Sequence, residues 1–185
     1  MNIWAMIAAC GNVTIRDIRK PRPGKDMRLF DGSVADVAAI RIAVLGTDCA
    51  IGKRTTATVL TNALNAAGIS TVLIGTGQTG LMQGAKYGVA MDAVPPQFCC
   101  GELERVILAA SRDALIEAFA DTRVIGVTIN HEDMTEADLD ATITRCRRDL
   151  VLPVSDALAR PAGDLVAMVL AACPGLRENR VLAAQ

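Results

Sequence analysis

The sequence has few aromatic side chains and no excess of charge of either sign. Aromatic residues make up 3% of its 185 residues, whereas hydrophobic residues make up 51%, so the core must consist of Ala, Val, Leu and Ile. Such a composition suits helices that pack closely on a sheet. The 19 basic and 20 acidic side chains give a formal net charge of -1, which supplies no field to attract nucleic acid or an anionic membrane. We expect neither as a partner.

Long apolar runs and cysteine pairs are missing as well. No stretch reaches the roughly 18 consecutive apolar residues of a membrane span, and the apolar opening segment lacks the basic region of a signal peptide. The six cysteines show no CxxC spacing, and the single histidine, His131, has no cysteine near it in the sequence. Neither a zinc site nor a disulfide framework is indicated. We expect a soluble, cytoplasmic protein with reduced thiols.

Three continuous apolar runs predict a parallel sheet. They lie at residues 41–45, 70–74 and 123–129, and their unbroken apolarity is typical of strands that are buried on both faces. A shorter strand is predicted at 151–154, at a sheet edge because it contains Pro153. With helices between the strands, the sequence predicts an α/β fold: a P-loop NTPase-like, three-layer α/β/α domain with a mostly parallel sheet.

Helices are predicted between and after these strands. Apolar residues recur there at spacings of three and four, which is the period of one helix face. Gly68 is typical of a helix C-terminus, and Thr135-Glu-Ala-Asp138 resembles a capping box at a helix start. Residues 81–101 predict a loop with one short strand. The predicted helices lie at 57–67, 101–120, 135–150 and 165–172.

The chain is expected to hold one domain, at residues 41–173. Ahead of it, residues 14–29 carry six basic side chains, two prolines and a glycine, a pattern that favours a solvated connector. Residues 1–40 are then a linker or the remnant of a preceding domain. Residues 174–185 are expected to form a tail with little to anchor it.

The turn between the first strand and its helix carries the strongest functional signal. A glycine-rich loop that ends in Gly52-Lys53 at a helix N-terminus directs backbone N–H groups and the helix dipole toward an anion, so it predicts a phosphate site. The usual pattern is GxxxxGK[ST]. Here five residues separate Gly46 from Gly52, and Arg54 stands where a Mg²⁺-binding hydroxyl is expected. The predicted binding residues are Gly46, Thr47, Asp48, Cys49, Ala50, Ile51, Gly52, Lys53, Arg54, Thr55 and Thr56.

Hydrolysis of a nucleotide is less well supported than binding. An NTPase orders Mg²⁺ with an acidic residue at a second strand end, and Asp92 and Glu132 are poorly placed for this. Thr55 or Thr56 would have to replace the missing hydroxyl, and we take Thr55 and Asp48 as the candidate metal ligands. The alternative for Asp48 is a turn residue that bonds its own backbone.

Polar residues after the second and third predicted strands are further candidate ligand contacts. Gln78 and Thr79 lie between glycines in Gly75-Thr-Gly-Gln-Thr-Gly80, and Asn130 follows the third strand. Ligands of α/β proteins bind outside the carboxyl ends of parallel strands. The alternatives are a tight turn permitted by glycine for the first pair and a strand-end cap for Asn130.

Three motifs together resemble a known family. They are Gly46-Thr-Asp-Cys-Ala-Ile-Gly-Lys-Arg-Thr-Thr-Ala57, Gly75-Thr-Gly-Gln-Thr-Gly80 and Phe98-x-x-Gly101-x-x-Glu104. They resemble the C-terminal P-loop domain of the D-glutamate N-acetyltransferase-like family, whose members were long described only as nucleotide-binding proteins. Arg19-Lys20-Pro21 resembles the family's link from an N-terminal Rossmann-like domain. The first motif also resembles the dethiobiotin synthetase turn, which has the same five-residue spacing.

The sequence departs from the family pattern in three places. The N-terminal domain has no counterpart, and neither has a segment of the form Val-Glu-Gly-Gln-Gly-Ser after Glu104. Gln97 stands where an Asp is expected before Phe98. These differences put a catalytic carboxylate and a substrate wall in doubt.

The resemblance implies acyl transfer from acetyl-CoA to the amine of D-glutamate, an acidic amino acid. This reaction needs a base for the amine, donors for the oxyanion and cations for the substrate carboxylates. His131 and Glu132, just past a strand, are the candidate bases, and Asp48 is a third catalytic candidate. The P-loop would cradle either a CoA phosphate or the oxyanion.

Two other functions stay open. One is an ATP- or GTP-dependent enzyme of the dethiobiotin synthetase kind, in which Mg²⁺ and Lys53 activate a carboxylate. The other is a truncated, non-catalytic module that binds a phosphate-bearing ligand. The contact surface left by an absent domain would favour a homo-oligomer.

Overall fold

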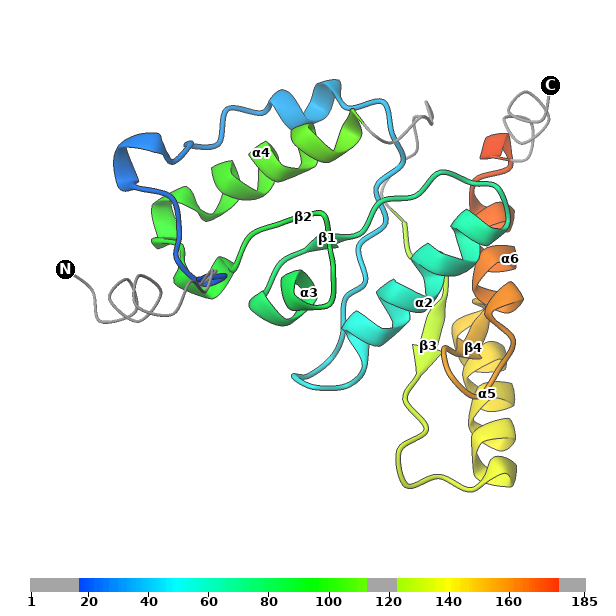
Figure 1. Ribbon diagram of the computed structural model, residues 1–185. Coiled ribbons are helices and arrows are strands. Elements are labelled where there is room, and N and C mark those ends of the chain that lie inside the picture. Colours follow the sequence, from blue (N-terminus) through cyan, green and yellow to red (C-terminus); the bar gives the residue numbers. More distant parts are fainter. Residues whose placement is uncertain (1–16, 113–122, 177–185) are drawn as a thin grey trace. The chain divides into compact units, whose positions relative to one another are not determined.

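The computed structural model describes residues 17–112 and 123–176 (Figure 1). The chain divides into two units. Unit 1 takes in Met1–Gly32 and Ile74–Ile107, and unit 2 takes in Ser33–Leu73 and Leu108–Gln185. In the described part of the chain, no helix is long and apolar enough to span a bilayer.

Unit 2 contains a parallel βαβ element. Strands β3 (Val127–Ile129) and β4 (Val154–Asp156) pair in parallel, and α5 (Glu136–Leu150) connects them. Thr135 caps α5 by accepting the Asp138 N–H at 3.2 Å, which confirms the capping box. Leu139 of α5 is buried against β4. The mixed helix and parallel-strand composition confirms the α/β class.

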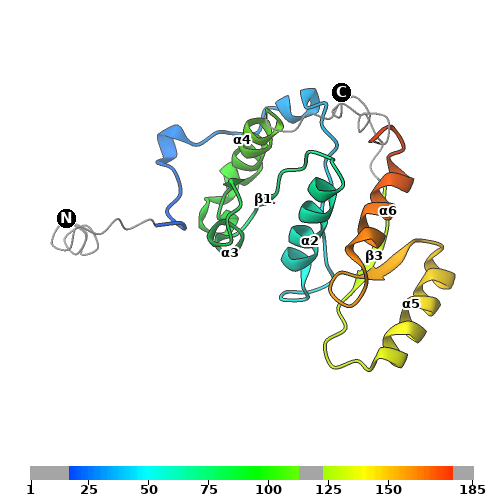
Figure 2. The same ribbon diagram turned by 45° about the vertical axis from the view of Figure 1, so that its right-hand side comes forward.

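Two further helices of unit 2 pack against each other. Helix α2 (Lys53–Ala66) and helix α6 (Ala162–Ala172) lie side by side in both ribbon views (Figures 1 and 2). Leu64 of α2 and Val169 of α6 are buried in one cluster, which Leu176 also joins, so the chain is anchored beyond the end of α6. Helix α2 ends where predicted, and Gly68 has a φ of +79°.

The predicted strand at 41–45 is wrong. These residues form no strand pairing, and Leu45 is 84% exposed. The Arg41 guanidinium instead bonds the carbonyl groups of Val34 and Val37 at 3.3 and 2.7 Å. An apolar run becomes a buried strand only when neighbouring strands and covering helices are present. Apolarity shows the capacity of the segment to pair, not the presence of a partner.

The other three predicted strands are shifted or shortened. The run at 70–74 contributes only β1 (Ile74–Gly75), and the run at 123–129 contributes only β3. The strand predicted at 151–154 begins three residues later, at Val154, because α5 continues to Leu150 and Val151 closes the helix with a φ of +53°. Pro153 lies just ahead of β4, where its carbonyl accepts the Val127 N–H at 2.9 Å. The pairing uses the carbonyl of Pro153 and not an N–H, so a proline is tolerated at this position.

Unit 1 contains a second, smaller parallel pair. Strand β1 pairs with β2 (Tyr87–Gly88), which confirms a short strand within 81–101, and α3 (Gln78–Met82) lies between them in the chain. Helix α4 (Cys99–Ser111) follows, and the rest of the helix predicted at 101–120 lies largely outside the described residues. The short 3₁₀ turns are η1 (Gly24–Asp26), η3 (Met91–Ala93) and η4 (Pro96–Phe98), with η2 (Ser33–Asp36) in unit 2.

The start of α4 docks the end of the predicted connector. Glu102 and Glu104 are 2% and 1% exposed. Glu102 accepts the Arg28 N–H at 3.0 Å, and Glu104 accepts the Asp31 N–H at 3.1 Å. Gly101 allows this approach, because a Cβ there would lie 2.1 Å from the Arg28 carbonyl oxygen. The Phe98-x-x-Gly101-x-x-Glu104 motif thus has a packing role: it docks the backbone of residues 28–31, whereas the side chains of Leu29 and Phe30 stay exposed.

Candidate functional site

The turn that precedes α2 has the backbone of an anion-binding loop. Ala50 and Gly52 have φ values of +55° and +84°, and Gly52 is the N-cap of the helix. Alternation of left-handed residues with ordinary ones lets successive N–H groups line one concave side. Glycine at position 52 adopts this conformation without the strain that a side chain would add.

The N-terminus of α2 is open. Gly52 makes no side-chain cap, and the first turn has no acidic residue. The first backbone hydrogen bond of the helix runs from the Thr56 N–H to the Gly52 carbonyl, at 2.9 Å. By helix geometry, the earlier N–H groups at 53–55 have no intrahelical acceptor, so they are available to an anion. This geometry fits the predicted phosphate site.

Two side chains of the loop bond within the loop itself. Lys53 Nζ donates to the Asp48 carbonyl, and the Lys53 stem lies against Gly46, where a Cβ would be 2.7 Å from Lys53 Cδ. The Asp48 carboxylate accepts the Cys49 N–H at 2.6 Å. Asp48 thus adopts the self-bonded turn, and Lys53 is folded over the loop. A bound phosphate would compete with the Asp48 carbonyl for Lys53.

The other predicted loop residues surround this turn. Thr47, Asp48, Cys49 and Arg54 are exposed, whereas Ile51, Lys53, Thr55 and Thr56 are half-buried. Within residues 17–112 and 123–176, no group of three or more His, Cys, Asp or Glu side chains is placed to hold a metal ion. The proposed Mg²⁺ contacts of Asp48 and Thr55 stay predictions.

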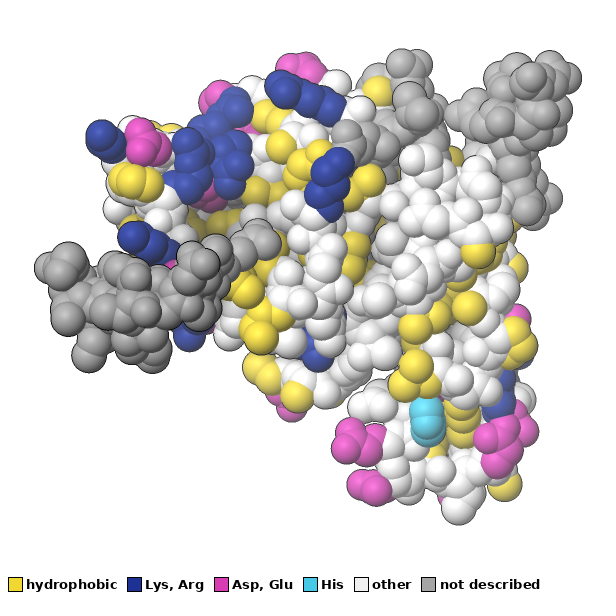
Figure 3. Space-filling view, in the orientation of Figure 1, with side chains coloured by type: hydrophobic (Ala, Val, Ile, Leu, Met, Phe, Trp, Pro, Cys, Tyr) yellow, Lys and Arg dark blue, Asp and Glu magenta, His cyan; other side chains and the backbone are white. Residues whose placement is uncertain are grey.

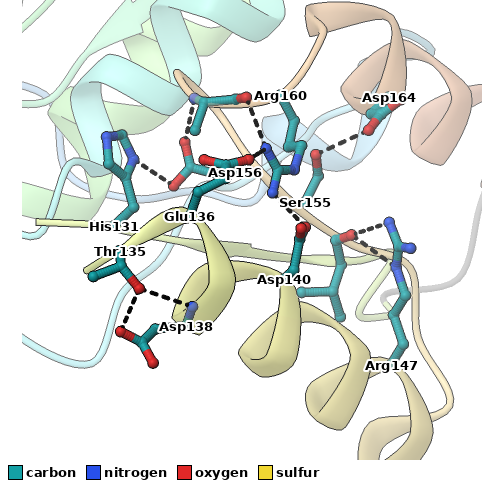
Figure 4. Close-up of polar contacts among 12 residues, drawn as sticks. His131, Thr135, Glu136, Asp138, Asp140, Arg147, Ser155, Asp156, Arg160 and Asp164 are labelled. Atoms are coloured by element: carbon teal, nitrogen blue, oxygen red, sulfur yellow. Dashed lines mark hydrogen bonds and ion pairs between the residues drawn. The ribbon is translucent and has the colours of Figure 1, made fainter.

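A histidine and a buried carboxylate meet at the ends of β3 and β4. The register pairs Ile129 with Asp156, so His131, two residues past Ile129, lies next to Asp156. His131 Nδ1 is 2.8 Å from Asp156 Oδ2 (Figure 4). Asp156 is 2% exposed, and its Oδ1 accepts the N–H groups of Leu158 and Ala159 at 2.8 and 2.7 Å. Three donors therefore hold this carboxylate in place.

Sequence reasoning missed Asp156. It lies 25 residues from His131 in the chain, and the last strand was predicted to end at residue 154. The available signal was an acidic residue two positions beyond that predicted end, at the edge where α/β proteins place ligands.

The surroundings of Asp156 keep it ionised. Burial alone would raise its pKa, but the N–H donors of Ala159 and Leu158 and the His131 ring outweigh burial, so the pKa of Asp156 lies below its ordinary value. At neutral pH the carboxylate is negative and acts only as an acceptor.

This lowered pKa predicts a pH-dependent contribution to stability. It is fully present above the ordinary carboxyl pKa of about 4 and is lost as the pH falls through the lower folded value. We expect the gap in free energy of unfolding between the native chain and Asp156→Asn to narrow below about pH 4. Urea unfolding of both proteins at a series of pH values measures it. A gap that is constant or widens in acid would contradict the expectation.

The neighbours of His131 in the chain bond to each other. Asn130 Nδ2 donates to Glu132 Oε2 at 3.4 Å, and the Glu132 N–H donates to Asn130 Oδ1 at 3.4 Å. Both residues are exposed. Asn130 therefore serves as a cap of the strand end in this structure, and a ligand contact from it stays a prediction.

The two parts of unit 2 that carry these groups lie at the same end of it. In both ribbon views, the turn before α2 and the loop after β3 lie at the same end of α2 (Figures 1 and 2). Figure 3 shows the single histidine, His131, at the surface, with a side chain that is 38% exposed. Gln78 and Thr79 open α3 in unit 1, so the two glycine-rich motifs fall in different units.

The chain is similar in sequence and in structure to proteins of one known family. A family model described as "Domain of unknown function (DUF1611_C) P-loop domain" matches residues 28–116. The crystal structure of a DUF1611 family protein from Anabaena variabilis ATCC 29413 matches with a TM-score of 0.74 and 21% identity, over 84% of this chain and 64% of that one. The family resemblance is confirmed. The DUF1611 match contains the turn at 46–56 and the motif at 98–104.

A curated relative has a functional name. D-glutamate N-acetyltransferase from Tritonibacter scottomollicae is 33% identical over 100 residues. The matched part is 54% of this chain and 28% of that protein, so the chain spans about a quarter of the length of this relative. Because its sequence identity to this chain is only 21%, the DUF1611 structure is evidence for a shared fold and for nothing more.

Proposed function

We propose that this chain binds a phosphate-bearing acyl donor at residues 46–56 and supports transfer of the acyl group to an amine. The observation that carries the proposal is the open N-terminus of α2 behind the left-handed residues Ala50 and Gly52. Backbone N–H groups and the helix dipole stabilise a phosphate at such an end. The name of the curated relative supports transfer of an acetyl group to D-glutamate, and we propose acetyl-CoA as the donor.

The chemistry sets what the site must do. The amine attacks the thioester carbonyl, a C–N bond forms, and the C–S bond breaks to release the thiol. The attacking ammonium first loses a proton to a base, and the leaving sulfur takes a proton. Past the end of β3, the candidate bases are His131 and Glu132. The N–H groups at the start of α2 serve either a CoA phosphate or the oxyanion of the transition state.

The proposal extends to the domain architecture, the cellular location and the oligomeric state. We propose a three-layer α/β/α arrangement of the P-loop NTPase kind for residues 41–173, supported by parallel pairing in each unit. The free cysteines among the described residues are in keeping with work in the cytoplasm. A homo-oligomer is proposed because it would cover exposed apolar side chains such as Leu45.

The experiment follows free thiol while the full chain is incubated with acetyl-CoA and D-glutamate, with L-glutamate and no acceptor as comparisons. We expect release above the blank that requires D-glutamate and survives chelation of metal ions. No release from a folded chain that binds CoA would reject acyl transfer and favour a non-catalytic binding module. Preference for ATP or GTP with Mg²⁺ over CoA in a parallel calorimetric titration would favour the nucleotide-dependent alternative.

A further inference from the structure

We infer that His131, through its Nε2, is the proton acceptor for the incoming amine, and that Asp156 is the residue that positions it. This inference rests on the proposed acyl transfer. It chooses His131 over Glu132 and assigns a role to a buried carboxylate that nothing else in the site uses.

The hydrogen bond between the two residues fixes which ring nitrogen carries the proton. An ionised carboxylate only accepts, so at 2.8 Å from Asp156 Oδ2 the His131 Nδ1 must be the donor. In the neutral ring, the proton then lies on Nδ1 and the lone pair on Nε2. Figure 4 shows the other ring nitrogen turned away from Asp156. Among the described residues Nε2 has no hydrogen-bond partner, so it is open to a substrate amine.

Backbone hydrogen bonds fix the orientation of the Asp156 carboxylate. Its Oδ1 accepts two backbone N–H groups, from Leu158 and Ala159, which leaves Oδ2 for the ring. The loop that supplies those donors is held to α5, because Arg160 pairs with Glu136 and with Asp140, the latter at 2.5 Å. The orientation of His131 is therefore set by a buried residue on one of the two paired strands.

Glu132 has no comparable support. It is exposed, and among the described residues its side chain bonds only the amide of exposed Asn130, at 3.4 Å. A base must be held within hydrogen-bond reach of the proton that it takes. Only His131 has a buried group that fixes its direction.

The tautomer can be measured directly, because the chain has a single histidine. In ¹⁵N NMR of the full chain, at a pH where the imidazole is neutral, we expect a protonated Nδ1 and an unprotonated Nε2. In Asp156→Asn, the carbonyl oxygen must stay with the Leu158 and Ala159 N–H groups, so the NH₂ group faces His131. That group donates, Nδ1 becomes the acceptor, and the proton moves to Nε2.

Asp164→Asn is the matched control. Asp164 accepts the Ser155 hydroxyl at 3.2 Å and does not contact His131, so this variant should keep the native tautomer. A native spectrum with the proton on Nε2, or a tautomer that Asp156→Asn leaves unchanged, would overturn the inference. If Asp156→Asn does not fold, the native spectrum alone decides.

Measurements of thiol release distinguish a failure of this inference from a failure of the proposed function. Loss of a correctly placed base lowers the rate by about 100-fold or more, so we expect Asp156→Asn to lose that much thiol release with CoA affinity unchanged. Asp164→Asn, the matched control, should retain its rate. A Glu132→Gln rate that falls as far would overturn the choice of base. The expected tautomer without any thiol release would reject acyl transfer and leave the positioning by Asp156 standing.

Discussion

Lys53→Met is expected to weaken CoA binding by about 10- to 100-fold, because a hydrogen bond to a charged group is worth about 1.5–3 kcal/mol. Methionine keeps much of the apolar stem that lies against Gly46 but removes the charge. Within the part of the chain that the structure describes, Lys53 bonds only the exposed Asp48 carbonyl, so the fold should be little affected. The N–H groups of the loop stay in place, so some affinity should survive. Isothermal titration with CoA measures the change.

Arg148→Met is the control for charge alone. Arg148 lies in the last turn of α5 and pairs with Asp149 at 2.8 Å, with three-quarters of its side chain exposed. Like Lys53→Met, this substitution removes one positive charge from unit 2. We expect the CoA affinity of Arg148→Met to stay within a factor of about two of the native affinity. Equal losses in both variants would mean that net charge, rather than contact from Lys53, governs binding.

Gly101→Ala is expected to lower the free energy of unfolding by about 3 kcal/mol, although alanine ordinarily favours a helix. The new Cβ would lie 2.1 Å from the Arg28 carbonyl oxygen and 2.4 Å from the carbonyl carbon of Leu29. Both are backbone atoms, so the docked segment must move. Glu102 and Glu104 are buried and would then lose N–H donors, at a cost of about 1–3 kcal/mol each. Chemical denaturation measures the change.

Gly163→Ala supplies the matched comparison. Gly163 lies in the first turn of α6, and an added Cβ there meets no atom within 4 Å. The same substitution should therefore be neutral or stabilising by up to about 1 kcal/mol. A Gly101→Ala protein as stable as Gly163→Ala would show that residues 28–31 are not docked on α4 as described.

Features with local signals could be predicted from the sequence. The N-terminus of α5 depends on Thr135 and Asp138, three residues apart, and the end of α2 depends on Gly68. The left-handed turn before α2 is equally local, because Gly52 and Lys53 adjoin the helix that they open. Each of these structures is determined by residues within one or two turns of the chain.

Features that depend on distant partners could not be predicted. Residues 41–45 have the composition of a strand but pair with no other strand of the described residues. The pairing of His131 with Asp156 depends on the register of β3 and β4, which no local pattern encodes. The acidic residues of α4 look like a solvated helix face, yet Glu102 is buried because a separate segment crosses it.

The central claim is that a phosphate binds at the start of α2, and amide NMR of the full chain during titration with CoA tests it most directly. The predicted result is saturable shifts of the N–H signals of residues 46–56, largest at 53–55, unchanged by chelation of metal ions and weakened in Lys53→Met. Saturable shifts confined to other parts of the chain, or no shifts at CoA concentrations up to the millimolar range, would contradict it.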